Sequence, residues 1–173
     1  MQAFRYKKSQ IAIHWIAAAL IIFLLITGTL VLAELPNTPL KIDNLRIHMT
    51  LGALSGLLVI TRILVRWRLP APPPVKGEWA GRAGHLALNL VVLLLAFSGM
   101  MLSLQSGAFN AVFGAGTLPL DFNEYTPRQI HGLASRLAMG LIALHVLAAI
   151  YHQFIVKDGL LTRMSLGRLR SDR

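Results

Sequence analysis

The segment QIHGLASRLAMGLIALHVLAAIYHQF, residues 129–154, is apolar enough to lie in a membrane, yet it contains His131, His145 and His152. An ionisable side chain inside a hydrocarbon layer is costly and usually has a function there. His131 and His145 are 14 residues apart, which is about 40° short of four full helical turns and about 21 Å of rise. The segment therefore predicts a membrane helix with two histidines on one face at two depths.

Three other stretches are also long and apolar. Residues 11–33 and 83–104 contain no formal charge, and a shorter run within 45–66 is interrupted by Arg62 and Arg66. Long basic side chains can reach the interface from a helix end, so these arginines are compatible with a span. A soluble domain would carry about 25% charged residues, whereas this chain carries 14%. With a fourth span at 127–156, we expect residues 1–173 to form one domain, an all-α integral membrane four-helix bundle.

The basic residues are distributed unevenly. Thirteen of the 17 lysines and arginines lie before the first span, around the second connection or after the fourth span. These three segments share one side of a four-span topology, and the positive-inside rule predicts that this side is cytoplasmic, with both termini there. Topology and contact with the lipid bilayer thus account for the net charge of +10, and we expect no nucleic-acid partner. The absence of cysteine excludes disulfides, thiolate haem ligands and iron–sulfur clusters.

The histidines can be matched in pairs by depth. Asp43 is a candidate cap for the second span and Thr126 for the fourth, and His48 and His131 each lie five residues after these caps. They should therefore face each other near the outer side. His14, near the inner end of the first span, is the candidate partner at the second depth.

The partner of His14 is either His145 or His152, since these two side chains are seven residues apart and only about 20° apart around the helix. Zinc and copper sites gather three or four protein ligands around one ion, whereas here the histidines are spread in pairs over two depths. The pattern favours two haem b groups, each with two axial histidines, in a four-helix bundle.

Other residues are candidates for supporting roles. Gly52 and Gly56 follow His48 at one-turn intervals and either let a flat macrocycle approach or pack helices closely. His85 opens the third span near its inner side, and it and His152, if not a ligand, are candidates for a quinone site.

Three segments resemble the bacterial cytochrome b561 family over nearly the whole chain: SQIAIHWIA at 9–17, LRIHMTLGALSGLLVITRILVRWRLPAPPP at 45–74, and IALHVLAAIYHQFIVKDGLLTRM at 142–164. The resemblance is strongest to the small members that carry two haems and oxidise superoxide. It implies haem b ligation by His14 and His145 on the cytoplasmic side, and by His48 and His131 on the periplasmic side, so it favours His145 over His152. It also implies location in the bacterial inner membrane.

The resemblance leaves two alternatives for the electron-transfer partners of this protein. The most similar members oxidise periplasmic superoxide to oxygen and reduce ubiquinone, while other members are haem subunits that relay electrons for a hydrogenase or formate dehydrogenase. Superoxide is an anion, so a positive local field would attract it; the candidate side chains are Lys41, Arg46, Arg128 and Arg136. Arg46 and Arg136 could instead pair with haem propionates, and Lys41 and Arg128 could be ordinary solvated charges.

Overall fold

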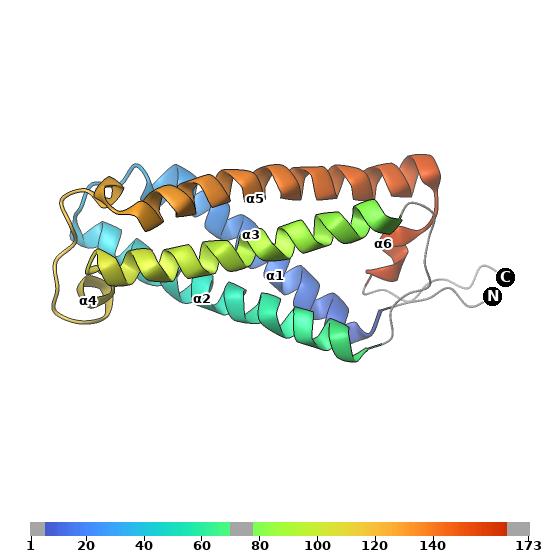
Figure 1. Cartoon of the computed structure of the whole chain (residues 1–173), viewed down its shortest axis with the longest axis horizontal. Coiled ribbons are helices and arrows are strands. Elements are labelled where there is room, and N and C mark those ends of the chain that lie inside the picture. The colour runs from blue at the N-terminus through green and yellow to red at the C-terminus, as the bar shows by residue number, and fades with distance from the viewer. Residues whose placement is uncertain (1–5, 70–77, 166–173) are drawn as a thin grey trace.

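The protein is described by a computed structural model that covers residues 6–69 and 78–165, and these ranges contain helices and no β-strand. Figure 1 shows the long helices running side by side. The elements, in chain order, are α1 (Lys8–Thr27) with the π-helical turn η1 (Gly28–Leu32), α2 (Pro39–Arg68), α3 (Glu78–Gln105), α4 (Ala108–Phe113), η2 (Phe122–Glu124), α5 (Thr126–Tyr151) with the π-helical turn η3 (His152–Val156), and α6 (Leu160–Arg163).

Four helices of the described ranges are long and apolar enough to cross a membrane. They are Lys8–Leu32, Pro39–Arg68, Trp79–Gln105 and Thr126–Val156. The expected all-α membrane bundle is thereby confirmed, although the second span begins earlier than residue 45. Many large apolar side chains are exposed on the outside of the bundle, as a lipid-facing surface requires.

The two helix starts inferred from capping residues are wrong in detail. Helix α2 begins at Pro39 after an extended Thr38, because proline fits the first helical position and needs no hydrogen-bonded N–H there. Asp43 therefore lies inside the helix, where its carboxylate pairs with Arg46. Helix α5 begins at Thr126 itself, and its N-cap residue is Tyr125, without a side-chain cap.

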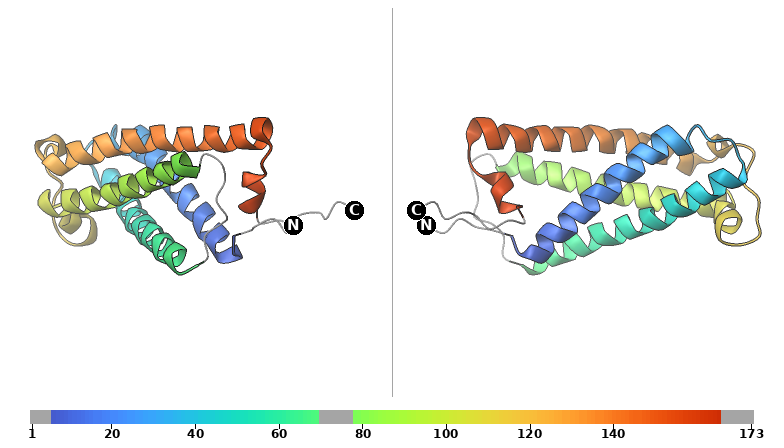
Figure 2. Two further views of the ribbon diagram at one scale, coloured as in Figure 1. Left: turned by 45° about the vertical axis from the view of Figure 1, so that its right-hand side comes forward. Right: turned by 180° about the vertical axis from the view of Figure 1, so that it is seen from behind.

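The two ends of the bundle differ. At one end the Tyr6 N–H donates to the Arg163 carbonyl (3.4 Å), and the Trp15 Nε1–H donates to the Met164 carbonyl (3.0 Å). These contacts fold α6 back towards the start of α1, and we call this the basic end. The opposite end carries α4 and η2, and we call it the loop end. Figures 1 and 2 show the α1–α2 pair diverging from the α3–α5 pair towards the basic end.

A buried apolar layer lies midway along the bundle. Leu25 of α1, Val91 of α3 and Ala138 of α5 form it, with Ala138 completely buried. Ala138 is seven residues from both His131 and His145 on α5, and this spacing places it on the same helix face, halfway between them. The two histidine depths are therefore separated by closely packed hydrocarbon.

Candidate haem-binding site

Four histidines form two facing pairs. At the loop end, the rings of His48 (α2) and His131 (α5) have centroids 6.3 Å apart, with their planes at 70°. At the basic end, the rings of His14 (α1) and His145 (α5) have centroids 6.4 Å apart, with their planes at 72°. All four side chains are half-buried. The structure thus brings together the pairs that the sequence predicts, each from two different helices.

The spacing of each pair fits one metal ion between two rings. An imidazole nitrogen binds a first-row metal at about 2.0–2.1 Å, and the ring centre lies about 1.1 Å behind that nitrogen, so two rings on opposite sides of one ion have centres about 6.3 Å apart. The observed 6.3 Å and 6.4 Å agree with this value. The described residues contain no cluster of three or more His, Cys, Asp or Glu side chains that could hold a metal. The donor set therefore suits a group that brings its own equatorial ligands, as haem does.

Helix α3 fixes the orientation of His131. Its Nδ1 lies 3.1 Å from the Leu95 carbonyl oxygen and 3.1 Å from Ser98 Oγ. A carbonyl can only accept, so Nδ1 carries the hydrogen and the Nε2 lone pair is free for a metal. The Nδ1 atoms of His14 and His48 are buried with no hydrogen-bond partner among residues 6–69 and 78–165, which is costly unless these rings bind something.

Two glycines, which the sequence analysis did not single out, pack against the loop-end rings. A Cβ added to Gly28 would lie 3.0 Å from His48 Cε1, and one added to Gly99 would lie 3.1 Å from His131 Cε1. Both distances are shorter than an ordinary contact of about 3.5–4.0 Å between carbon atoms. Hydrogen is therefore the only side chain that leaves both rings where they are.

The two glycines that the sequence did single out differ from each other. A Cβ added to Gly52 would meet nothing within 4 Å, so there is open space beside the helix one turn after His48. A Cβ added to Gly56 would lie 2.9 Å from Ala96 Cβ, so Gly56 is a point of close contact between α2 and α3. The helix surface at Gly52 is thus open, whereas Gly56 serves helix packing.

The 14-residue spacing first noticed on α5 recurs on all four spans. The pairs are His14 and Gly28 on α1, His48 and Arg62 on α2, His85 and Gly99 on α3, and His131 and His145 on α5. The two members of a pair are 14 residues apart, so each helix places one at each depth. Because adjacent spans run in opposite directions, the first member lies at the basic end on α1 and α3 and at the loop end on α2 and α5. The loop-end level is formed by Gly28, His48, Gly99 and His131, and the basic-end level by His14, Arg62, His85 and His145. This repetition is the signal in the sequence that could have identified Gly28, Gly99 and Arg62.

The two other histidines lie at the basic end. The ring of His85 (α3) packs edge-on against His145, with centroids 5.3 Å apart. His152 Nδ1 lies 2.6 Å from Asp158 Oδ2, and Asp158 Oδ1 also accepts from the Leu160 N–H (3.2 Å). The ring that faces His14 is thus His145, while His152 is held by a carboxylate from the following turn.

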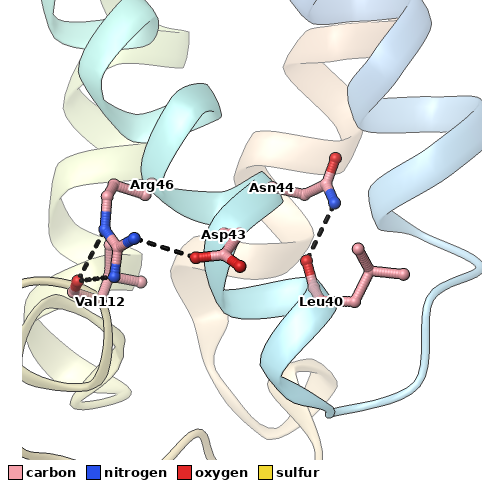
Figure 3. A network of polar contacts seen from close by, with 5 residues as sticks. All are labelled: Leu40, Asp43, Asn44, Arg46 and Val112. Atoms are coloured by element: carbon pink, nitrogen blue, oxygen red, sulfur yellow. Dashed lines mark hydrogen bonds and ion pairs between the residues drawn. The ribbon is translucent and has the colours of Figure 1, made fainter.

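Two of the four predicted superoxide-attracting side chains hold the loop end together. The Arg46 Nε and Nη2 groups donate to the Val112 carbonyl (3.1 and 3.0 Å) and Nη1 pairs with Asp43 Oδ1 (2.9 Å), so Arg46 fastens α4 to α2 (Figure 3). Lys41 Nζ donates to the Leu35 carbonyl (2.7 Å) and lies 5.6 Å from the centre of the Phe122 ring. Both side chains stabilise the cover over the loop-end histidines.

The other two differ in their position relative to the loop-end pair. Arg128 is half-buried in the first turn of α5, close enough to Lys41 and His131 for its charge to act on both. Arg136 is exposed and follows His131 by five residues, which places it about 140° around the helix from that ring. Arg128 therefore lies beside the loop-end pair, whereas the helix register turns Arg136 away from it.

A family model described as prokaryotic cytochrome b561 matches residues 5–167. The chain belongs to this family. The matching relatives include cytochrome b561 homolog 2 of Escherichia coli K12, 30% identical over 97% of this chain and 94% of that protein, and the probable superoxide oxidase CybB of Yersinia pestis, 28% identical over 92% and 95%. Cytochrome b562 of Cereibacter sphaeroides is 27% identical over 92% and 94%. The protein is therefore a multi-pass bacterial membrane cytochrome that binds haem b and transfers electrons.

Proposed function

We propose that this cytochrome b561 holds two haem b groups, one between His48 and His131 and one between His14 and His145. The observation that carries this proposal is the pair of ring spacings at two depths, each suited to one axially ligated iron. When bound, haem b supplies one-electron transfer. The positive-inside rule makes the basic end cytoplasmic, so the loop end is periplasmic in the inner membrane.

We further propose that the protein oxidises superoxide at the loop end and reduces ubiquinone. Each superoxide gives up one electron and leaves as dioxygen, and ubiquinone takes up two electrons and two protons to form the quinol. The Yersinia pestis relative named as a probable superoxide oxidase, similar over nearly its full length, supports this substrate.

The chain's own residues have three roles in this reaction. The two rings of each histidine pair would hold one haem, which would supply electron transfer without forming a bond to the substrate. Arg128, beside His131, supplies a positive field for an incoming anion. The buried layer around Ala138 keeps water and ions out of the space between the two depths.

The test uses the purified oxidised protein in detergent, exposed to a steady enzymatic flux of superoxide while the haem b α-band is recorded. We expect the reduced band to appear, superoxide dismutase to abolish it, and added ubiquinone to discharge it. If dithionite reduces the protein but superoxide does not, the superoxide proposal is wrong and the chain is an electron relay for a partner dehydrogenase subunit.

A second test separates the two α5 arginines. Arg128→Gln should slow the reaction with superoxide by roughly two- to tenfold at low salt and weaken its salt dependence, because it removes a charge beside the loop-end pair. Arg136→Gln should have a smaller effect, since its side chain points away, and Arg66→Gln at the basic end controls for the loss of net charge. Equal slowing by all three substitutions would mean that only net charge matters.

A further inference from the structure

The basic-end level contains a cation on α2. Arg62 follows His48 by 14 residues, the same spacing that separates His145 from His131 on α5. It therefore faces the bundle interior at the depth of the basic-end pair. Its side chain is half-buried, and it lies close enough to His14, His85 and His145 for its charge to act on all three.

Within the four apolar segments that can cross the membrane, no carboxylate lies near this charge. Within residues 8–32, 39–68, 79–105 and 126–156 the only acidic residue is Asp43, which lies at the loop end and pairs with Arg46. Asp158, beyond the last span, is engaged by His152 and by the Leu160 N–H. Tyr6 lies close enough to Arg62 to interact with it, but a guanidinium inside a membrane protein is normally paired with an anion, a role that a bound anionic group can fill.

The two levels differ at the matching positions. Where the basic end has Arg62 and His85, the loop end has Gly28 and Gly99, which pack on the axial rings and carry no charge. Arg128, the cation that acts on His131, lies in the first turn of α5, where water and salt screen its charge. The basic-end level therefore has a fixed positive charge in a less polar setting.

We propose that Arg62 binds a carboxylate of the haem held by His14 and His145, and that its charge makes this haem the more easily reduced of the two. The inference rests on the proposed two-haem function. An arginine is always charged and binds a carboxylate through two parallel hydrogen bonds, and haem b carries two propionate carboxylates. A reduced haem carries one electron more than an oxidised one, so a nearby positive charge stabilises the reduced form. An electron that enters at the loop end is then drawn to the basic end.

The test compares three variants of the haem-loaded protein in detergent: Arg62→Gln, Arg62→Lys and, as the matched control, Arg66→Gln. Arg66 lies one turn further along α2 and is exposed, so the control removes the same charge from the same helix. The readouts are haem per chain by the pyridine haemochrome method and the two midpoint potentials by redox titration. The loop-end haem is identified by its loss in His48→Ala.

We expect Arg62→Gln to shift the reduction equilibrium of the basic-end haem at least tenfold towards the oxidised form, which for one electron is about 59 mV, or to lose that haem alone. Arg62→Lys should retain most of the potential but hold the haem less firmly, since lysine keeps the charge without the two-pronged geometry. Arg66→Gln should shift the basic-end potential much less than Arg62→Gln, because Arg66 is exposed and acts on His85 but not on His14 or His145.

Unchanged haem content and potentials in Arg62→Gln would overturn the proposal and leave Arg62 as a partner of lipid phosphates. Equal loss of both haems would also overturn it, because it would indicate a general structural role. These readouts do not involve superoxide, so the outcome is independent of whether superoxide is the electron donor. A wild-type protein without two haems would instead refute the proposed function.

Discussion

The contact between Gly99 and His131 gives a quantitative prediction. In Gly99→Ala the new methyl carbon would lie 3.1 Å from His131 Cε1, against an ordinary separation of about 3.5–4.0 Å. The ring must therefore move by about 0.4 Å or more, yet its Nδ1 is held by the Leu95 carbonyl. Overpacking of this kind costs about 1–3 kcal/mol, which corresponds to a roughly 5- to 150-fold lower affinity for the loop-end haem.

The matched control is Gly140→Ala on α5. Gly140 is exposed, an added Cβ there meets nothing within 4 Å, and it lies on the opposite face of α5 from His131. Both substitutions gain about 1 kcal/mol of helix propensity, so the comparison isolates the contact with the ring. The assay is the transfer of haem to excess apomyoglobin, followed optically. We expect faster loss of one haem in Gly99→Ala only; identical rates in the two variants would refute the reasoning.

Three further variants test individual contacts. His48→Ala should leave one haem per chain, because its partner ring loses the second ligand; two haems by pyridine haemochrome would disprove the pairing. His152→Ala should retain both haems, since its ring is held by Asp158; loss of one would transfer the basic-end ligand to His152. Trp15→Phe removes the hydrogen bond to the Met164 carbonyl and should lower stability by about 0.5–1.5 kcal/mol, seen as a lower melting temperature in detergent; an unchanged melting temperature would mean that α6 is held by other contacts.

The spans and the pairing of histidines could be predicted because both depend on local period and length. Apolar runs locate the spans, and a spacing of 14 residues fixes the relative face and depth of two side chains on one helix. The starts of the helices were harder to predict, since Asp43 is a good capping residue in isolation but lies inside α2 once Pro39 begins that helix.

Contacts between helices could not be predicted from the local sequence pattern. Arg46 binds a carbonyl 66 residues away, and nothing in its own neighbourhood indicates this. His145 and His152 lie on nearly the same face, so period alone could not choose between them. The choice follows from the chain after α5, where Lys157 adopts a left-handed conformation (φ 56°) and the chain places Asp158 against His152.

Gly28, Gly99 and Arg62 could have been found from the sequence, but only by applying to every span the spacing first noticed on one. The sequence pattern does not mark a glycine as functional, because it has no side chain. The role of Gly28 and Gly99 is seen only in their contacts with histidine rings from other helices. Taken alone, Arg62 is typical of an interfacial arginine at a helix end. Its spacing of 14 residues from His48 places it instead at the level of the basic-end pair.

The most direct test of the account is the haem content and coordination of the wild-type protein. Pyridine haemochrome analysis against protein concentration should give two haem b per 19.0 kDa chain, and electron paramagnetic resonance of the oxidised protein should show two low-spin signals, each with two imidazole ligands. One haem per chain, or a high-spin signal from an open axial position, would contradict the two-level arrangement of His48 with His131 and His14 with His145.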